Sequence, residues 1–434
     1  MSEHLEGTGR RLPKAARPFL SSQYRMLIGA LSLSIFGSGM WLVGIVFQVR
    51  ELGGGPIELS FVATGNALGL VGAVLLGGVA ADRIPQKRIL LVVESCKFAA
   101  IALAAALALT GTLEVWHLAM ISLLLGVADG FFYPAYSALL PAILPADHLL
   151  AANGFEGVLR PALMQAAGPA IASTIIAAFS PGAVFAVVAL SQVLAVVVLS
   201  LLRPTAVRRE LDEVDSHPLR SVFADIRGGF AYMVRTPWLL ATLLYALLLV
   251  LVIMGPIEVL LPFAVTRQTG GGALEFAIVL AAFGVGGVVG SIVVASLRLP
   301  RRYLTVMNML WGAGCLPLAV MGLTTHLWVM AVALFIVGFC FQAATVIWGT
   351  LLQRRVPSDL LGRVSSLDFF VSLAFMPISM ALAGPVGELV GLAPTFVVAG
   401  VVPIFLATAA ILLARLPRDE IANPLDTQPA AEQA

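Results

Sequence analysis

Charged residues are scarce in this chain of 434 residues, and their scarcity excludes most classes of soluble protein. Asp, Glu, Lys and Arg together make up 12% of the sequence, whereas hydrophobic residues make up 59%. Soluble globular proteins contain about 25% charged and about 45–50% apolar residues. With a mean hydropathy of +0.98, the composition indicates an integral membrane protein and not a soluble fold with one large core.

Cysteine and histidine are also rare. The three cysteines, Cys96, Cys315 and Cys340, lie in apolar stretches without the Cys-x-x-Cys spacing of a disulfide framework or a zinc site. The five histidines are scattered and none lies at ligand spacing from another. We therefore expect no metal and no cofactor, and the net charge of +2 gives no reason to expect a nucleic-acid partner.

Two sequence signals are missing altogether. The chain contains no Gly-x-x-x-x-Gly-Lys-Ser/Thr motif, so it has no P-loop of its own to bind ATP. The first ~20 residues are polar and lack an apolar core, so we expect no cleaved signal peptide.

Long hydrophobic runs are what the chain has in abundance. A helix needs about 20 mostly apolar residues to cross a bilayer. Twelve stretches meet this requirement, at 24–50, 57–80, 89–110, 114–138, 152–178, 181–202, 237–265, 272–297, 302–323, 326–352, 362–387 and 391–415. They are too continuous for β-barrel strands, which alternate polar and apolar residues. The predicted fold is an all-α membrane protein with twelve transmembrane helices.

The basic residues indicate which side of the membrane each loop faces. When both termini are placed on one side, 22 of the 26 Lys and Arg fall in tails or loops on that side. Arg50 and Arg267 fall on the opposite side, and Lys97 and Arg160 fall within spans. Basic residues accumulate on the cytoplasmic side of membrane proteins. We therefore expect a multi-pass protein of the plasma or inner membrane with both termini in the cytoplasm.

The longest polar stretch between spans divides the chain into two halves. In order, we expect a cytoplasmic tail, a six-helix bundle, a cytoplasmic linker, a second six-helix bundle and a cytoplasmic tail, at 1–23, 24–202, 203–236, 237–415 and 416–434. The halves resemble each other, since 139–157 aligns with 351–369 and places Glu156 on Asp368. Two similar halves are expected of transporters that rock about a site at the membrane midplane.

One loop carries a more specific pattern. The segment GVAADRIPQKR resembles the motif Gly-x-x-x-Asp-Arg-x-Gly-x-Lys/Arg that the major facilitator superfamily has between its second and third helices. The matching residues are Gly78, Asp82, Arg83 and Lys87, with Pro85 in place of the second glycine. The resemblance covers nearly the whole chain and implies the major facilitator fold of two pseudo-symmetric six-helix bundles. We interpret the motif, together with Arg363, as an inner gate that holds the halves together on the cytoplasmic side.

Three Gly-Pro pairs within predicted spans are candidate hinge or packing positions. They are Gly168–Pro169, Gly255–Pro256 and Gly384–Pro385. Proline removes a backbone hydrogen bond and kinks a helix. The first pair resembles the Gly-Pro motif of drug/proton antiporters. The segments 132–145 and 351–367 are similar to the enterobactin-exporter and macrolide-efflux branch of the superfamily, and this similarity implies export.

Charges inside a membrane are costly and usually functional. Asp129 and Arg160 lie on consecutive spans, each about 12 Å from the inner end at 1.5 Å per residue, so we expect a salt bridge between them. Glu156 lies one turn from Arg160 and completes an acid–base–acid cluster. Such a cluster is a candidate for holding and releasing a proton, and a static structural pair is the alternative.

Four more charges lie within spans. Glu94 and Lys97 are three residues apart, and we expect an ion pair at the inner rim. Glu258 follows the second Gly-Pro pair and is interpreted as a proton or cation site, or as an outer-mouth residue reached by water. Asp368 is expected to cap or pair at the inner gate, with titration as the alternative.

The family resemblance implies that the first, fourth, seventh and tenth helices line a central cavity. These helices carry aromatic, Met and Gln candidates, namely Phe36, Trp41, Phe132, Tyr136, Tyr245, Met254, Phe339, Gln342 and Trp348. Such a wall suits a bulky apolar or amphipathic substrate. It suits a sugar poorly, because unpaired hydroxyls are penalised there.

The sequence as a whole predicts a secondary active transporter that exports an amphipathic drug, antibiotic or siderophore-like metabolite in exchange for protons. Its expected partners are this small substrate, protons and the lipid bilayer, and we expect it to act as a monomer. An uncoupled facilitator or importer of a small nutrient or lipid is the first alternative. A polytopic membrane enzyme is a remote one, because the sequence offers no clustered nucleophile and base and no metal-binding set.

Overall fold

The computed structural model describes residues 14–203, 230–297 and 299–425, and within these ranges the chain is helical, with no β-strand. Twelve helices or helix groups are long and apolar enough to cross a membrane. This confirms the predicted fold class. The ends of the spans lie close to the predicted ones. The fourth span departs by five residues, because its helix continues through Pro141 to Ile143 instead of ending near 138.

The first half of the chain supplies six spans. They are α1 (Ser22–Glu51), α2 (Pro56–Arg83), α3 (Gln86–Leu109), α4 (Val115–Ile143), the group of α5 (Ala146–Pro161), η2 (Ala162–Ala167) and α6 (Gly168–Ala178), and α7 (Pro181–Ser200). A short helix, η1 (Lys14–Leu20), precedes them.

The second half supplies the other six. They are the group of α9 (Pro237–Gly255), η3 (Pro256–Leu260) and α10 (Leu261–Thr269), then α11 (Ala273–Ser296), α12 (Tyr303–Ala313) with α13 (Leu318–Met321), α14 (Leu327–Arg355), α15 (Ser358–Leu373) with α16 (Met376–Leu389), and α17 (Leu392–Leu413). A short helix, α18 (Leu416–Ala422), follows.

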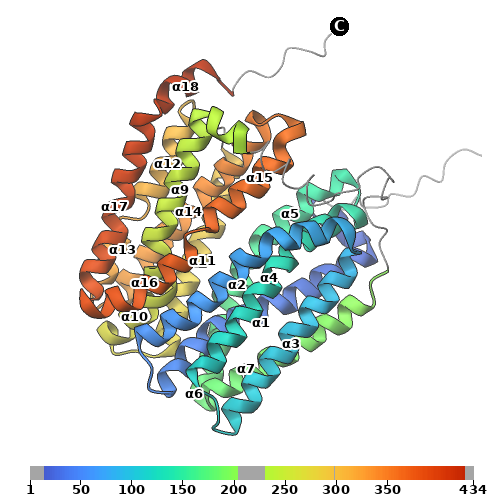
Figure 1. Cartoon of the computed structure of the whole chain (residues 1–434), viewed down its shortest axis with the longest axis vertical. Coiled ribbons are helices and arrows are strands. Elements are labelled where there is room, and N and C mark those ends of the chain that lie inside the picture. Colours follow the sequence, from blue (N-terminus) through green and yellow to red (C-terminus); the bar gives the residue numbers. More distant parts are fainter. Residues whose placement is uncertain (1–13, 204–229, 298, 426–434) are drawn as a thin grey trace, which may run out of the picture.

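These spans form two bundles that stand side by side (Figure 1). In the first bundle α2 packs on α4 and α7 packs on both α1 and α3, while in the second α11 packs on α14 and α12 on α17. Successive spans run in opposite directions, so the loops gather at two ends. We call the end where α1 begins and α14 stops the basic end, because it carries most of the basic residues. The opposite end, where α1 stops, is called the far end.

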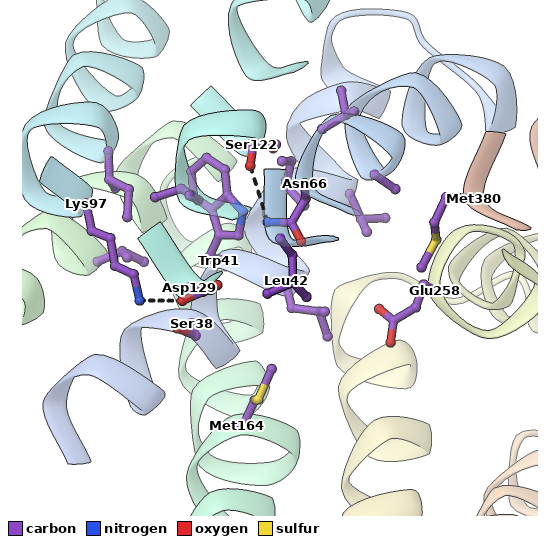
Figure 2. Close-up of a pocket in the computed structure, with 18 of the residues that line it drawn as sticks. Ser38, Trp41, Leu42, Asn66, Lys97, Ser122, Asp129, Met164, Glu258 and Met380 are labelled. Carbon is purple, nitrogen blue, oxygen red and sulfur yellow. Dashed lines mark hydrogen bonds and ion pairs between the residues drawn. The ribbon is translucent and has the colours of Figure 1, made fainter. Parts of the chain in front are cut away.

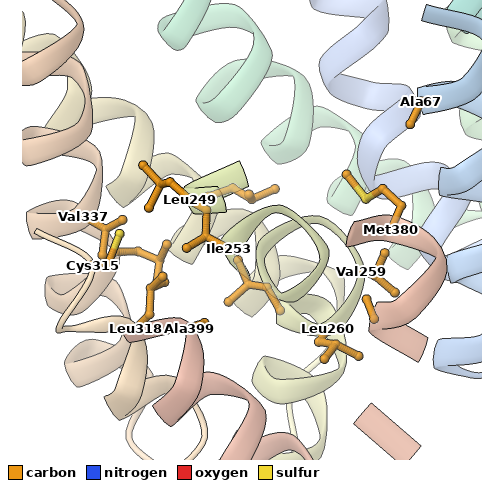
Figure 3. Packing of buried hydrophobic residues seen from close by; sticks show 14 of the residues in the cluster. Ala67, Leu249, Ile253, Val259, Leu260, Cys315, Leu318, Val337, Met380 and Ala399 are labelled. Carbon is orange, nitrogen blue, oxygen red and sulfur yellow. The ribbon is translucent and has the colours of Figure 1, made fainter. Parts of the chain in front are cut away.

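The two bundles are joined most tightly toward the far end. One cluster of buried apolar side chains runs through the far half of α1 and into the second bundle. In Figure 3 this cluster continues from Leu318 and Val337 through Val259 and Met380 to Ala67 of the first bundle. Toward the basic end, the first bundle has a separate cluster of its own. The bundles therefore share a hydrophobic core in one half of the molecule only.

Close helix contacts at the far end depend on a glycine and a serine. The hydroxyl of Ser60 on α2 donates to the carbonyl of Met380 on α16 over 2.5 Å, and the N–H of Gly384 donates to that hydroxyl over 2.7 Å. A Cβ at Gly384 would lie 2.7 Å from the Cα of Ile57, so only glycine fits there. We call this contact between α2 and α16 the far-end seam.

The expected C-terminal tail is folded where it is described. Arg355 at the end of α14 pairs with Asp419 of α18 over 2.5 Å. Glu420 is buried and accepts hydrogen bonds from the N–H groups of Leu304 and Thr305 at the start of α12. A carboxylate stabilises the N-terminus of a helix because the free N–H groups carry partial positive charge. The expected tails at 1–23 and 416–434 and the linker at 203–236 otherwise lie largely outside the described residues.

Candidate substrate and proton site

Two adjoining cavities lie between the bundles near mid-height of the molecule. One has a volume of about 310 Å³ and is walled mainly by the first bundle, and the other has about 280 Å³ and is walled mainly by the second. They share Leu42, Val46, Met164 and Glu258. We treat the two together as the central cavity.

The wall of the central cavity is mostly apolar. Trp41, Met164 and Met380 face its first-bundle part, where Figure 2 shows their side chains turned toward one space. The second-bundle part is lined by Met254 and Phe283 among others. Such a surface binds apolar groups through dispersion and adapts to irregular shapes, since Met is flexible and polarisable.

Three of the predicted cavity residues line the central cavity, namely Trp41, Met254 and Gln342. Six do not line it, namely Phe36, Phe132, Tyr136, Tyr245, Phe339 and Trp348. A helix beside a cavity turns only one stripe toward it, because successive residues are spaced around 3.6 positions per turn. The resemblance identified helices that face the cavity but not which face of each helix points inward.

The other aromatic candidates have structural surroundings of their own. Tyr245 is buried within the second bundle, with 2% of its surface exposed. Phe132 stacks on Tyr136 with ring centroids 6.0 Å apart. Trp348 packs against Trp238 and Trp311. Tyr136 lines a separate cavity of about 700 Å³ that also includes Glu156 and Arg160.

A buried ion network lies in the first-bundle wall. The ammonium Nζ of Lys97 lies 2.5 Å from a carboxylate oxygen of Asp129 and 3.8 Å from Oε1 of Glu94. The Ser34 hydroxyl donates to the same oxygen of Glu94 over 2.8 Å. We call Glu94, Lys97 and Asp129 the buried triad. Exposure rises from 0% at Glu94 through 5% at Lys97 to 31% at Asp129. Lys97 and Asp129 both line the cavity, and Asp129 is the more exposed of the two (Figure 2).

The triad corrects two expectations. Asp129 pairs with Lys97 of α3 and not with Arg160, and the pair of Glu94 and Lys97 is deeply buried and not at the rim. Lys97 lies about 16 Å past the start of α3 at 1.5 Å per residue, well into the span. The charged residues themselves were predicted correctly, but their partners depend on which helices are neighbours in the bundle, and α3 packs on α4.

Arg160 instead belongs to a cluster nearer the basic end. Its Nε lies 2.6 Å from Oε1 of Glu156, four residues earlier, as the sequence predicts for one helix face. Its guanidinium also lies 5.2 Å from the ring centroid of Tyr133. Tyr133 lines both this cavity and the central one, so the cluster lies beside the central site without forming part of the triad.

Glu258 is the only charged residue that the second bundle contributes to the described lining of the central cavity. It lies on η3, where Pro256 supplies no N–H and the chain takes a π-turn, with the N–H of Leu261 bonded to the carbonyl of Pro256. Its side chain is exposed to the cavity. Among the described residues it has neither an ion-pair nor a hydrogen-bond partner.

Ser379 of α16 braces the chain just before this turn. Its hydroxyl accepts a hydrogen bond from the N–H of Gly255 over 2.8 Å and donates to the carbonyl of Leu251 over 2.7 Å. The second Gly-Pro pair is thus fixed to α16. In the first bundle, a Cβ on Gly168 would lie 2.9 Å from the Cα of Gly39, so the first pair lies at a close crossing with α1.

Asp368 lies away from the central cavity. It accepts hydrogen bonds from Nε1 of Trp348 over 3.0 Å and from the hydroxyl of Ser372 over 3.3 Å. These are neutral donors, and among the described side chains no basic group pairs with it. Asp368 thus bonds to side chains of α14 and of its own helix, and a capping or pairing role at the inner gate, or titration, stays a prediction.

The hydrogen bonds of the described loop-motif side chains lie within the first bundle. Lys87 donates to the carbonyls of Ser200 and Leu202 at the end of α7, within its own bundle. Arg83 is exposed at the basic end, and Gly78 has open space beside it. The side chains of Asp82 and Arg363 lie outside the described residues.

Among the polar residues of the site, Asn66 and Gln165 are polar candidates in the sequence without an assigned role, whereas Ser38 and Gln192 were not singled out. Ser38, Gln192 and Gln165 line the central cavity, and Asn66 donates to the carbonyl of Ser122 over 3.3 Å (Figure 2). Short polar side chains are common in membrane helices, where they bond the backbone or neighbouring helices. The sequence does not show which face of each helix points toward the cavity, so it does not distinguish these polar residues from residues that pack between helices.

Comparison with known proteins identifies relatives along nearly the whole chain. It is 23% identical to macrolide efflux protein A of Streptococcus pyogenes, over 87% of this chain and 92% of that protein. It is 26% identical to the multidrug efflux pump Tap of Mycolicibacterium fortuitum, over 89% and 94%. It is also 26% identical to the enterobactin exporter EntS of Shigella boydii, over 84% and 85%.

Solved structures agree on the fold. The chain superposes on the crystal structure of the nucleoside transporter NupG with a TM-score of 0.71 and 12% identity, covering 90% of this chain and 98% of that one. At this identity the likeness concerns the fold alone. The profile of the transmembrane secretion effector family matches residues 14–433. This protein therefore belongs to the transmembrane secretion effector family, within the major facilitator superfamily.

Proposed function

We propose that this protein exports an amphipathic small molecule across the plasma membrane in exchange for protons, and that the buried triad is its proton site. The efflux relatives support export. The observation that carries proton coupling is that two carboxyls, Glu94 and Asp129, share one ammonium, Lys97, at the wall of an apolar cavity.

The charge balance of the triad supports this role. With both carboxyls ionised the triad carries a net charge of −1, and uptake of one proton makes it neutral. Net charge within a membrane protein is costly, because the surroundings have a low dielectric constant. Asp129 is the triad member most exposed to the cavity, so it exchanges protons with cavity water, while Lys97 pairs with it and with Glu94.

The second part of the proposal concerns the conformational state of the transporter. It is supported by the hydrophobic cluster that the bundles share toward the far end and by the separate cluster of the first bundle toward the basic end. We assign the basic end to the cytoplasm by the distribution of Lys and Arg. With the bundles sealed at the far-end seam, the cavity then faces inward, ready to collect substrate. The two bundles, at 24–202 and 237–415, would rock as units to open the far end.

The substrate is expected to be bulky and amphipathic. Aliphatic, Met and aromatic side chains together make up most of the wall, and the polar groups gather mainly on its first-bundle side. Apolar surface favours binding of apolar groups, while unpaired hydroxyls are penalised. Each proton that moves inward brings about 2.3 kcal/mol per 100 mV of membrane potential, which drives accumulation of the substrate outside.

Replacement of Asp129 tests the proposal. Asp129→Asn keeps the shape of the side chain and removes the proton site, so we expect efflux of a macrolide from an efflux-deficient host to fall to the level of protonophore-treated wild type. Efflux is measured as macrolide accumulation in cells, with membrane content of the variant checked by immunoblot. Glu51→Gln, an exposed carboxyl at the far end, is the matched control and should behave as wild type.

Two results would contradict proton coupling at the triad. Efflux by Asp129→Asn at the wild-type rate would exclude Asp129 as the proton carrier. Wild-type efflux that does not respond to a protonophore would favour the uncoupled facilitator.

A further inference from the structure

The central cavity has an unbalanced charge on its second-bundle side. The described charged residues that line it are Lys97, Asp129 and Glu258. Lys97 is already engaged by Asp129 and Glu94, and its ammonium lies 4.9 Å from the ring centroid of Phe132. It therefore offers no free charge to Glu258, which lies across the cavity in Figure 2.

A carboxylate without a partner in such a place needs a counter-charge from outside the chain. Ionised groups in low-dielectric surroundings are strongly disfavoured unless they are paired. Two entering species can supply the positive charge, namely a proton and a cationic ligand. Glu258 opens onto both parts of the central cavity, so a ligand bound to it has room on either side.

The residues around Glu258 suit the apolar part of a cation. Met164, Met254 and Met380 line the cavity together with it, and Ile257 lies beside it on the same turn. Thioether groups are soft and polarisable and adapt to ligands of varied shape. A delocalised or shielded positive charge is weakly hydrated, so it enters such a site at less cost than a small ammonium ion.

We propose that Glu258 is the anionic anchor of the substrate site and that the transported class is lipophilic cations, such as hydrophobic amines and quaternary onium ions. The charge pairs with Glu258, and the apolar groups fill the two parts of the central cavity. This deepens the proposed function and rests on it for the direction of transport. The assignment of Glu258 as the anchor concerns equilibrium binding of the cation and does not depend on the direction of transport.

The anchor lies next to the far-end seam. Met380 lines the cavity with its side chain while its carbonyl accepts the hydrogen bond of Ser60 from the other bundle. Ser379, the preceding residue, braces the chain before the π-turn that carries Glu258. A cation at Glu258 therefore contacts the helix on which closure of the far end depends.

A pair of probes of matched shape and opposite charge tests the anchor. Tetraphenylphosphonium and tetraphenylborate share four phenyl groups and differ in the sign of their charge. We measure binding of each to the purified full-length protein in lipid nanodiscs, by titration with radiolabelled or competing probe. Wild type should bind the phosphonium tighter than the borate by about tenfold or more, the size of one modest ion pair.

Glu258→Gln should remove this preference, by weakening phosphonium binding about tenfold while leaving borate binding unchanged or stronger. Glu258→Asp should retain the preference. Glu388→Gln, an exposed carboxyl on α16, should match wild type. An unchanged size-exclusion profile and melting temperature establish that each variant is folded.

Other outcomes separate this inference from the proposed function. Equal phosphonium affinity of wild type and Glu258→Gln would overturn the anchor, and proton-driven efflux would then stand alone. If Glu258→Gln binds the phosphonium normally but no longer exports, Glu258 carries a proton and the anchor is wrong. If binding depends on Glu258 while efflux ignores the proton gradient, the anchor holds and the proposed coupling fails.

Discussion

At the scale of single residues, the buried triad sets the strongest constraint on the chain. Lys97 satisfies two carboxyls at once, and one of them, Glu94, has no exposed surface. Oε2 of Glu94 is buried without a hydrogen-bond partner. Loss of the cation would therefore leave two acidic groups without compensation in the interior of the first bundle.

Substitution of Lys97 should consequently destabilise the protein. Removing one partner of a buried ion pair costs about 3–5 kcal/mol, so Lys97→Met should lower the melting temperature in detergent clearly. Adding Glu94→Gln should recover part of the loss, because one of the two stranded charges disappears. Thermal-shift fluorescence of purified single and double variants checks this. A Lys97→Met protein as stable as wild type would mean that Lys97 does not supply a needed counter-charge to Glu94 and Asp129.

The sequence predicted residue pairs only where they lie on one helix. Glu156 and Arg160 are four residues apart, so helix geometry alone brings them together. Lys97 and Asp129 come from different helices, and their contact depends on how α3 and α4 pack and rotate. Hydropathy that is high all around a span does not reveal its inward face, and six cavity candidates such as Tyr245 do not line the central cavity in this structure.

At the scale of elements, helix ends and crossings were harder to predict than the spans. The length and apolar composition of each span determine its existence, and these are plain in the sequence. The fold of α18 was not predicted, because its sequence is that of a polar tail. Asp419 and Glu420 owe their structural roles to contacts with α14 and α12, which are distant in the sequence. Similarly, nothing in the sequence of α2 shows that Ser60 faces the other bundle.

The far-end seam makes a prediction at this scale. A larger side chain at Gly384 would collide with the backbone of α2 at Ile57, so Gly384→Val should part the seam and favour the state that is open at the far end. A cysteine placed at Leu59, which lines the cavity near the seam, should then react faster with a maleimide that cannot cross the membrane. The experiment uses intact cells and a background without the native cysteines.

The matched control is Gly349→Val on α14, where a Cβ meets open space. It should leave labelling at the wild-type rate. Equal labelling in both variants would show that the seam does not govern access from that side.

At the scale of the whole molecule, the asymmetry between the two ends determines the orientation we assign. The predicted distribution of basic residues places the basic end in the cytoplasm. Arg83 at the basic end and Arg267 at the far end are both exposed, so cysteines at these positions can report the two sides.

Cysteine labelling should establish this orientation. In a background without Cys96, Cys315 and Cys340, a membrane-impermeant maleimide added to intact cells should modify Arg267→Cys and spare Arg83→Cys. Permeabilised cells should show both sites labelled. The reverse pattern would place the termini outside and would turn the exporter proposal into an import proposal.

The members of the buried triad differ in how far they are exposed, and this difference has a kinetic consequence. Asp129 lines the central cavity with 31% of its side chain exposed, whereas Glu94 has no exposed surface and is paired with Lys97. The two carboxyls therefore equilibrate with bulk pH on different timescales. After a sudden pH jump, infrared difference spectra should resolve a fast carboxyl band from Asp129 and a delayed band from Glu94. The delay between the two bands measures how often the first bundle opens locally around Glu94.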